Sequence, residues 1–210
     1  MSRKIIGLMG GTFDPVHHGH LVAAEEARSQ FNMDQVIFIP AGKPPHKTNK
    51  ELSTPEDRLA MTKAAVSSNP YFTVSDIEIK KSGLSYTINT VRAMKEIYPG
   101  QEIYFITGAD AVLEILTWKN YTNLLEECIF VAASRPGFDL GKMTSDMNAF
   151  PPKLLERIKT IQVPALAISS TDIRQRVCEE RPIKYLLPET VEEYILCRRL
   201  YSRCLVKSEE

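Results

Sequence analysis

Histidines and glycines are concentrated in one segment near the start of the chain, Gly10-Gly11-Thr12-Phe13-Asp14-Pro15-Val16-His17-His18-Gly19-His20. His17 and His20 are three positions apart, so their imidazoles are expected to project toward the same spot, which Gly19 keeps open. The two leading glycines allow the backbone to approach a ligand without an intervening Cβ atom. The helix expected to follow offers free N–H groups that suit phosphate oxygens. The segment therefore predicts a phosphate-binding loop.

Two other interpretations of this segment remain open. A His-x-x-His pair also has the spacing of zinc ligands, but a third ligand of suitable type is missing nearby. Alternatively the histidines cap a helix and do nothing more, which is the default for one histidine but fits three within four positions less well. The segment matches neither the dinucleotide fingerprint G-x-G-x-x-G nor a P-loop, so neither common nucleotide-binding signature applies.

A second motif, Ile168-Ser169-Ser170-Thr171-Asp172-Ile173-Arg174, also joins an expected strand to an expected helix. Hydroxyl residues at a helix start usually act as caps, and on its own this motif favours that interpretation. The hydroxyls and free N–H groups also suit a polyphosphate, to which Arg174 would add a charge-assisted contact. Because both motifs are expected at the same edge of a sheet, phosphate binding gains support.

The elements that must position these motifs alternate between short apolar runs and amphipathic helical stretches, which predicts βαβ units on a parallel sheet. The expected strands are Lys4–Met9, Gln35–Pro40, Phe72–Ile79, Glu102–Thr107, Cys128–Ala133 and Thr160–Ile168. Helices are expected after the first motif, after the Thr54-Pro55 cap, near Thr87 and over Glu189–Tyr201. In such a sheet, ligands bind beyond the carboxyl ends of the strands.

We therefore expect an α/β fold, a Rossmann-like doubly wound parallel sheet with a small C-terminal helical appendix. Residues 1–169 are expected to form the nucleotide-binding α/β domain. Residues 170–210 are expected to form a helical subdomain packed on it as part of one structural unit. Residues 41–53 and 135–152 are rich in glycine and proline and predict long loops, which often serve as lids or binding loops.

Charge and apolar content exclude several classes of partner. The chain has 26 basic and 26 acidic residues, so its overall field does not attract nucleic acid or acidic membranes. No apolar run approaches the ~18 residues of a membrane span, and the N-terminal one is too short for a signal peptide. The four cysteines show no CxxC spacing, which favours reduced thiols. We expect a cytoplasmic protein with no nucleic-acid and no membrane partner.

The two motifs together resemble the T/H-x-G-H and I-S-S-T-x-x-R signatures of the nucleotidyltransferase superfamily. Shorter segments resemble one branch of it, the bacterial nicotinate-nucleotide adenylyltransferases. These segments are Gly10-Gly11-Thr12-Phe13-Asp14-Pro15, Gly108-Ala109-Asp110, Thr117-Trp118 and Ser134-Arg135-Pro136-Gly137. The resemblance extends from Lys4 to about Tyr201, which is nearly the full chain.

This resemblance implies transfer of the adenylyl group of ATP to nicotinate mononucleotide, giving deamido-NAD and pyrophosphate, with Mg²⁺ carried by ATP. The acceptor phosphate is mostly ionised near neutral pH, its second pKa being about 6, so no strong general base is required. Catalysis can then consist of positioning for in-line attack and neutralisation of the developing charge. The resemblance leaves open whether the protein is a homo-oligomer.

The resemblance also assigns roles to individual residues. The catalytic residues would be His17, His20 and Arg174, on the ATP phosphates. ATP would also contact Gly10, Gly11, Thr12, Phe13, Gly108, Asp110, Ser170 and Thr171. The acceptor would contact Thr87, Trp118, Lys43, His46 and Arg135, and no residue is assigned as a metal ligand. Trp118 is equally compatible with a core position, and Lys43 and His46 with solvated loop positions. The strand-end position of Asp110 favours the ribose role over a helix cap.

Three alternatives share parts of this pattern. A pantetheine-phosphate adenylyltransferase or a cytidylyltransferase has the same first loop, although the Ile-Ser-Ser-Thr form and the chain length favour the nicotinate branch. A fragment of a class I aminoacyl-tRNA synthetase also has a Gly-His signature, but the neutral charge and the missing lysine-rich second signature speak against it. A non-catalytic nucleotide sensor on the same fold is disfavoured by the intact His17, His20 and Arg174.

Overall fold

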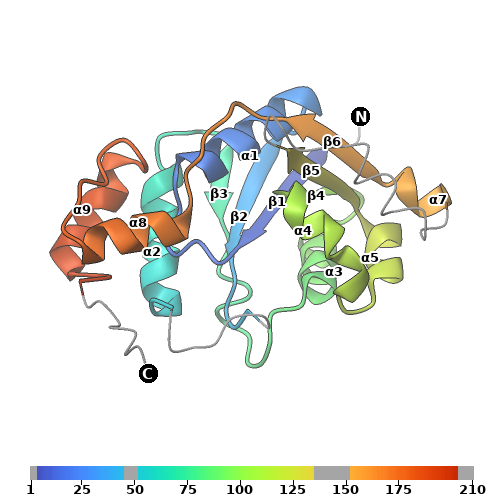
Figure 1. The fold of residues 1–210 in the computed structure, drawn as a ribbon. Coiled ribbons are helices and arrows are strands. Elements are labelled where there is room, and N and C mark those ends of the chain that lie inside the picture. Colours follow the sequence, from blue (N-terminus) through green and yellow to red (C-terminus); the bar gives the residue numbers. More distant parts are fainter. Residues whose placement is uncertain (1–3, 45–51, 135–151, 203–210) are drawn as a thin grey trace, which may run out of the picture.

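A computed structural model describes residues 4–44, 52–134 and 152–202, and its centre is a parallel β-sheet (Figure 1). The strands of the described residues are β1 (Ile5–Gly11), β2 (Gln35–Pro40), β3 (Phe72–Val74), β4 (Glu102–Gly108), β5 (Ile129–Ser134) and β6 (Ile158–Gln162). Their order in the sheet is β3-β2-β1-β4-β5-β6, with every pair of neighbours parallel. This arrangement confirms the predicted Rossmann-like fold.

Two strand predictions were wrong in their limits. β3 ends at Val74 instead of Ile79, because Ser75 donates a last hydrogen bond to Phe38 and the chain then turns, with the N–H of Lys80 bonded to the carbonyl of Asp76. β6 covers Ile158–Gln162, whereas a strand was expected over Thr160–Ile168. The segment after β6 contains Pro164, which has no N–H to donate to a neighbouring strand.

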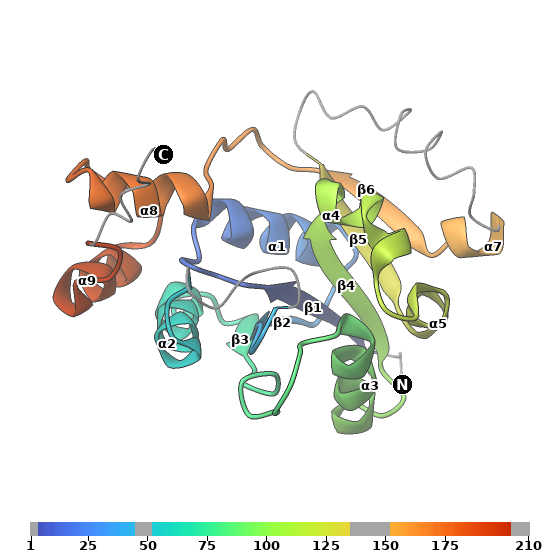
Figure 2. The ribbon, with the colours of Figure 1, turned by 60° about the horizontal axis from the view of Figure 1, so that its bottom comes forward.

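Helices cover both faces of the sheet (Figure 2). On one face α1 (His18–Gln30) packs on the strands, and α2 (Pro55–Val66), α8 (Ser170–Cys178) and α9 (Glu189–Arg198) continue that core on the β3 side (Figure 1). The other face carries α3 (Thr87–Ile97), α4 (Ala109–Leu113), the 3₁₀ helix η2 (Ile115–Thr117), α5 (Tyr121–Glu127) and α7 (Pro152–Leu155).

Successive side chains of each strand alternate between these two core layers. Ile6 and Leu8 of β1 are buried in the layer with α3 and α5, and Met9 is buried in the layer with α1. Successive side chains of a strand point to opposite faces, so a strand covered on both sides needs apolar residues at consecutive positions. The continuous apolar runs in the sequence have this physical origin.

The start of α2 follows from its local sequence. Thr54 is the N-cap residue, and its hydroxyl accepts a hydrogen bond of 3.1 Å from the backbone N–H of Asp57. Pro55 occupies the first helical position, where no N–H is needed, and Glu56 and Asp57 place negative charge at the positive end of the helix dipole. The predicted beginning of this helix is confirmed.

The C-terminal segment is bound to the rest of the molecule by side-chain hydrogen bonds. The hydroxyl of Tyr194 in α9 donates to Oδ1 of Asp57 in α2 at 2.9 Å, and Thr190 donates to the carbonyl of Ala64 at 3.1 Å. The hydroxyl of Tyr201 donates to Oδ1 of Asp14 at 2.7 Å. The division of the chain at residue 169 stays a prediction.

The state of the cysteines differs from the expected four reduced thiols. Cys178 is disulfide-bonded, whereas Cys128 and Cys197 are free. The expectation of four reduced thiols was therefore wrong for Cys178. None of the helices in the described part of the chain has the length and apolar character that crossing a membrane requires.

Candidate functional site

The first phosphate motif lies where the direction of chain winding changes in the sheet. β1 lies between β2 and β4, and Met9 of β1 pairs with Ile106 of β4. The helices that follow these two strands, α1 and α4, leave toward opposite faces. Open α/β sheets bind ligands in the crevice beyond such a pair of strands. Gly10–Phe13 and Gly108–Asp110, both predicted to bind ATP, therefore meet at one edge.

His17 and His20 contact each other at the start of α1. Their ring centroids are 3.8 Å apart, with an angle of 30° between the planes. His17 is the N-cap residue and is 4% exposed. Its backbone N–H donates to Nδ1 of His20 at 3.2 Å, so Nδ1 is an acceptor and the proton of a neutral His20 ring belongs on Nε2. The histidines thus do cap a helix, and Nε2 carries the ring proton of a neutral His20.

The glycines of the first motif are required by packing as well. A Cβ atom on Gly10 would lie 2.7 Å from the ring of Phe105, and one on Gly11 would lie 2.7 Å from the ring of Phe13. A Cβ atom on Gly19 would lie 3.0 Å from the imidazole of His17. Small residues at these positions therefore let the aromatic and imidazole rings close in on the backbone of the loop.

The second motif contacts the first directly. The hydroxyl of Ser170 donates to the carbonyl of Pro15 at 2.8 Å, and Nη1 of Arg174 donates to the carbonyl of Asp14 at 2.7 Å. Nη2 of Arg174 lies 3.4 Å from the hydroxyl of Thr171. Ser169 is the N-cap residue of α8 and accepts from the N–H of Asp172. The capping interpretation therefore holds for Ser169, and the predicted meeting of the two motifs is confirmed.

Asp14 is a buried charged residue of the first loop for which the sequence predicted no role. It is 1% exposed and accepts hydrogen bonds from Tyr201 at 2.7 Å and from the N–H of Ser53 at 3.3 Å. Burial, followed by the charge of Asp14, raises the pKa of Tyr201 well above its ordinary value. Tyr201 therefore stays protonated and donates at any physiological pH. The contact links residues that are far apart in the sequence, so no local spacing could have indicated it.

A cavity of about 570 Å³ adjoins this edge of the sheet. Its lining residues are Ser85, Tyr86, Thr87, Ala111, Glu114, Thr117, Trp118, Lys119 and Leu124. Thr87 and Trp118, both predicted to contact the acceptor, face the same space, and Thr87 is the first residue of α3. Nζ of Lys119 lies 4.3 Å from the centroid of the Tyr86 ring. Lys119 and Glu114 are charged residues of this cavity that sequence reasoning missed.

Trp118 contacts both the core and the cavity, which are the two environments that the sequence left open. Its ring is half-buried and meets the core rings of Phe105 and Phe130 in edge contacts, with centroids 6.3 and 6.0 Å away. It also lines the 570 Å³ cavity. The two core rings fix the position of the indole, so that the cavity has a rigid aromatic wall.

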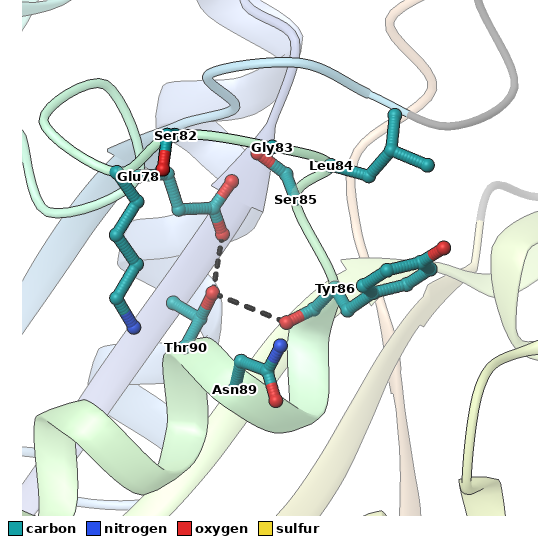
Figure 3. A pocket seen from close by; sticks show the side chains of 9 residues that line it. Glu78, Ser82, Gly83, Leu84, Ser85, Tyr86, Asn89 and Thr90 are labelled. Atoms are coloured by element: carbon teal, nitrogen blue, oxygen red, sulfur yellow. Dashed lines mark hydrogen bonds between the residues drawn. The ribbon is translucent and has the colours of Figure 1, made fainter.

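A second, smaller cavity of about 290 Å³ lies against segment 81–86 (Figure 3). It is lined by Glu78, residues 81–86, Asn89 and Thr90. The hydroxyl of Thr90 donates to Oε1 of Glu78 at 2.6 Å. Figure 3 shows the Tyr86 ring turned away from Glu78 and Thr90. The two cavities share Ser85 and Tyr86 as lining residues.

The remaining predicted site residues are placed as follows. Gly108 and Asp110 are exposed at the start of α4, at the carboxyl end of β4. Lys43 is exposed, and its backbone pairs with Ser85. His46 and Arg135 lie outside the described residues. Within the described residues no group of three or more His, Cys, Asp or Glu side chains could hold a metal ion.

Comparison with known proteins identifies relatives of the chain. The model of the cytidylyltransferase-like family matches residues 8–176. A protein of Moorella thermoacetica named "Probable nicotinate-nucleotide adenylyltransferase" is 56% identical over 197 residues, which cover 93% of this chain and 91% of the relative. A protein of Desulfitobacterium hafniense with the same name is 52% identical over 198 residues, which cover 94% of this chain and 96% of the relative.

Solved structures share the fold. Nicotinic acid mononucleotide adenylyltransferase of Plasmodium falciparum complexed with NaAD superposes with a TM-score of 0.75 at 20% sequence identity, covering 95% of this chain and 98% of that chain. The relatives do not support the pantetheine-phosphate or aminoacyl-tRNA synthetase alternatives. Because the family model matches most of its length and its relatives are more than half identical to it, the chain belongs to the nicotinate-nucleotide adenylyltransferases of the cytidylyltransferase-like family.

Proposed function

We propose that the protein transfers the adenylyl group of ATP to nicotinate mononucleotide, releasing pyrophosphate and forming deamido-NAD. The observation that carries this proposal is the contact between the two phosphate motifs, in which Ser170 and Arg174 bond to the carbonyls of Pro15 and Asp14. This contact puts the starts of α1 and α8 side by side. Two helix N-termini, two imidazoles and a guanidinium would then be available to one triphosphate.

ATP would lie along the edge formed by β1 and β4. The backbone of Gly10, Gly11, Thr12 and Phe13 would hold the nucleotide, and Gly108 and Asp110 would meet its ribose. His17 and His20 would contact the phosphates, with Nε2 of His20 as a donor because its Nδ1 accepts from the backbone. Ser170, Thr171 and Arg174 would hold the β- and γ-phosphates. The donors of Arg174 that are bonded neither to Asp14 nor to Thr171 would make this contact.

Mg²⁺ is proposed to enter as part of the ATP substrate. Mg²⁺ keeps several water ligands and is usually bound through phosphates and one or two carboxylates, so it needs no cage of protein ligands. The ion would neutralise charge on the leaving pyrophosphate together with Arg174.

Nicotinate mononucleotide would occupy the 570 Å³ cavity. Trp118 would stack on the pyridine ring, and the start of α3 at Thr87 would receive the carboxylate, since a helix N-terminus offers N–H donors and the positive end of a dipole. Lys119 adds a positive charge to the same wall. Lys43, His46 and Arg135 are proposed to approach the acceptor from the two long loops.

The chemical step follows from this placement. An acceptor phosphate oxygen attacks the α-phosphorus of ATP, the new P–O bond forms, and the bond to the β-phosphate oxygen breaks with its electron pair leaving on pyrophosphate. The acceptor phosphate is already ionised near neutral pH, so no side chain has to remove a proton. The protein contributes positioning and charge neutralisation, which are the terms that dominate phosphoryl-transfer catalysis.

Release of pyrophosphate tests this proposal. The purified protein is incubated with ATP and Mg²⁺, and with nicotinate mononucleotide, nicotinamide mononucleotide or pantetheine phosphate as acceptor. We expect release with nicotinate mononucleotide, and deamido-NAD as the second product. Stimulation of pyrophosphate release by pantetheine phosphate alone would show that the acceptor is not a pyridine mononucleotide. Nucleotide binding with no release from any acceptor would support a non-catalytic sensor.

A further inference from the structure

The largest fully buried side chain of the described residues belongs to an arginine. Arg58 in α2 is 1% exposed. Its guanidinium donates to four backbone carbonyls: Nε to Ser53 at 3.2 Å, Nη1 to Thr12 at 2.9 Å and to Ala41 at 2.6 Å, and Nη2 to Gly42 at 3.1 Å. Burying a charge is costly unless its hydrogen bonds are satisfied, so a guanidinium at this position requires an explanation.

The carbonyls that Arg58 binds belong to the loops at the ends of two neighbouring strands. Thr12 follows β1 and lies in the proposed ATP loop, and Ala41 and Gly42 follow β2. The C=O and N–H of a trans peptide point in opposite directions. Drawing the Thr12 carbonyl inward therefore turns the N–H of Phe13 away from Arg58. One side chain thus fixes the peptide orientation of both loops at once.

The loop after β2 passes this constraint on to the acceptor cavity. The N–H groups of Gly42 and Lys43 donate to the hydroxyl of Ser85 at 3.0 and 3.2 Å, and the N–H of Ser85 donates to the carbonyl of Lys43 at 2.9 Å. Ser85 lines the 570 Å³ cavity beside Tyr86 and Thr87. Arg58 is therefore connected to that cavity through the backbone of Gly42 and Lys43 and the hydroxyl of Ser85, without lining it.

Close packing also restricts the loop after β2 relative to the segment that leads to Ser85. A Cβ atom on Gly42 would lie 2.3 Å from the carbonyl oxygen of Glu78, so the loop after β2 touches the backbone of the segment that leads to Ser85. A shift of Gly42 must therefore displace residues 78–85 as well. This contact and the hydrogen bonds to Ser85 make the two segments move together.

We propose that Arg58 is a positioning residue that sets the placement of the ATP loop relative to the acceptor cavity, by way of the carbonyls of Thr12, Ala41 and Gly42 and the hydroxyl of Ser85. This inference rests on the proposed function, because it assigns the two sites to the two substrates of one reaction. In-line transfer requires both substrates in one geometry, and displacements of about 1 Å can cost about a hundredfold in rate.

The guanidinium fork is what a lysine cannot replace. Lysine keeps the positive charge but presents one nitrogen, which cannot reach carbonyls of two loops and of the segment before α2 together. The test variant is therefore Arg58→Lys. Arg157→Lys is the matched control, because Arg157 also donates to two backbone carbonyls, those of Leu125 and Glu126, at 3.1 and 3.2 Å. Arg157 lies just before β6, at the opposite edge of the sheet.

The first readout needs no substrate. In hydrogen exchange of the free protein, we expect the amides of Gly42, Lys43 and Ser85 to exchange about tenfold faster in Arg58→Lys than in the unmodified protein. Arg157→Lys should leave them unchanged. Unchanged exchange at Ser85 in a folded Arg58→Lys protein would overturn the proposed connection, whatever the protein's substrates are.

The second readout separates positioning from mere stabilisation. Binding of nicotinate mononucleotide is followed by the fluorescence of Trp118, which is the only tryptophan of the chain. Arg58→Lys should weaken this binding about tenfold and raise the KM for ATP as well, measured below the unfolding transition. Normal affinity for both substrates in a folded variant would reduce Arg58 to a stabilising role. No binding by the unmodified protein would instead refute the proposed acceptor.

A variant at the other end of the connection covers the case in which Arg58→Lys does not fold. Ser85→Ala removes the acceptor of the two loop N–H groups. Ser85 lies on the acceptor side, yet we expect this change to raise the KM for ATP about fivefold, since coupling between two sites acts in both directions. An effect confined to the acceptor would show that the two sites are independent and would overturn the inference.

Discussion

The guanidinium of Arg174 donates a hydrogen bond of 2.7 Å to the backbone carbonyl of Asp14, 160 positions earlier in the chain. This bond joins the start of α8 to the loop after β1 and brings the two phosphate motifs of the sequence into one site. Because Nη1 is held by the protein, the plane of the guanidinium is fixed before any nucleotide binds. A preorganised fork loses less conformational entropy when it binds a phosphate.

Arg174→Lys is expected to be a severe change. A lysine ammonium is a point charge that cannot hold the Asp14 carbonyl and two phosphate oxygens in one plane, so the KM for ATP or the turnover should worsen about tenfold or more. Steady-state kinetics with varied ATP measure this. Arg176→Lys is the matched control on the same helix, because Arg176 pairs with Asp172 at 2.8 Å on the surface. Equal kinetics for both lysine variants would show that Arg174 does not contact ATP.

His20→Asn separates the capping role of this residue from its proposed catalytic role. The asparagine Oδ1 can take the place of Nδ1 and accept from the N–H of His17, but it supplies no donor at the position of Nε2. Turnover should fall on the order of a hundredfold, as for a lost donor to a developing charge, while the free energy of unfolding stays close to that of the unmodified protein. Normal turnover in the folded variant would leave His20 with capping only.

His17→Ala should lower turnover on a similar scale, again on the order of a hundredfold. His18→Ala is the control, because the backbone N–H of His18, and not its imidazole, makes the described contact with Leu186 at 3.1 Å. The measurement is turnover at saturating ATP and acceptor, with urea unfolding beside it. A loss that is equal for His17→Ala and His18→Ala would indicate disturbance of the helix start.

The acceptor cavity should discriminate a carboxylate from a carboxamide. A carboxylate at the start of α3 accepts every hydrogen bond offered, whereas a carboxamide turns its NH₂ toward a donor at about 1–3 kcal/mol per mismatch. The kcat/KM for nicotinate mononucleotide should exceed that for nicotinamide mononucleotide by about a hundredfold. Thr87→Val should reduce the ratio, and Trp118→Ala should weaken both substrates alike. Equal efficiency with both in the unmodified protein would reject the nicotinate assignment.

The docking of α9 on α2 should weaken in acid. Burial on its own would raise the pKa of Asp57, but hydrogen bonds from Thr54 and Tyr194 and the charge of Arg198 hold it below its ordinary value of 3.8. A lowered folded-state pKa means that the stabilisation is complete above the ordinary value and is lost as the pH falls through the folded-state value.

Asp57→Asn tests this linkage. The variant should lose about 1–2 kcal/mol in the free energy of unfolding at pH 7, as expected for charge-assisted hydrogen bonds, and the difference from the unmodified protein should shrink in strong acid. Urea unfolding across the pH range measures both. Asp76→Asn is the control, because Asp76 forms an exposed pair with Lys80. A difference that does not depend on pH would show that the Asp57 charge is not the cause.

The thiols should differ in reactivity. Burial raises the pKa of Cys128 to about 12, so its thiolate is scarce at neutral pH and the side chain is shielded. Cys197 is exposed. Treatment of the folded protein with iodoacetamide, followed by mass spectrometry, should label Cys197 first and Cys128 only after denaturation. Labelling of Cys128 at the same rate as Cys197 would show that the end of α5, where Cys128 lies, opens readily.

The sequence was sufficient to predict those features of the fold and site that depend on local patterns of residues. Continuous apolar runs predicted the parallel sheet, and the rule that strand ends share an edge predicted that the two motifs would lie together, as the bonds of Ser170 and Arg174 to the first loop show. Contacts between distant segments, such as Tyr201 with Asp14, left no such pattern. Arg58 did leave a trace, because it stands at the spacing of the buried residues Met61, Thr62 and Ala65 on one face of α2. A charge within a buried helical stripe is a signal that sequence analysis could use.

The residues that form hydrogen bonds to the first loop are made late in synthesis of the chain. The strand and the loop that begin the site leave the ribosome early, but Ser170, Arg174 and Tyr201 are made near the end of the described chain. A nascent chain that stops at residue 169 already contains all six strands yet lacks every one of these three side chains. All the described strands are thus made before these side chains, and the proposed nucleotide site is complete only when the last helices have been made.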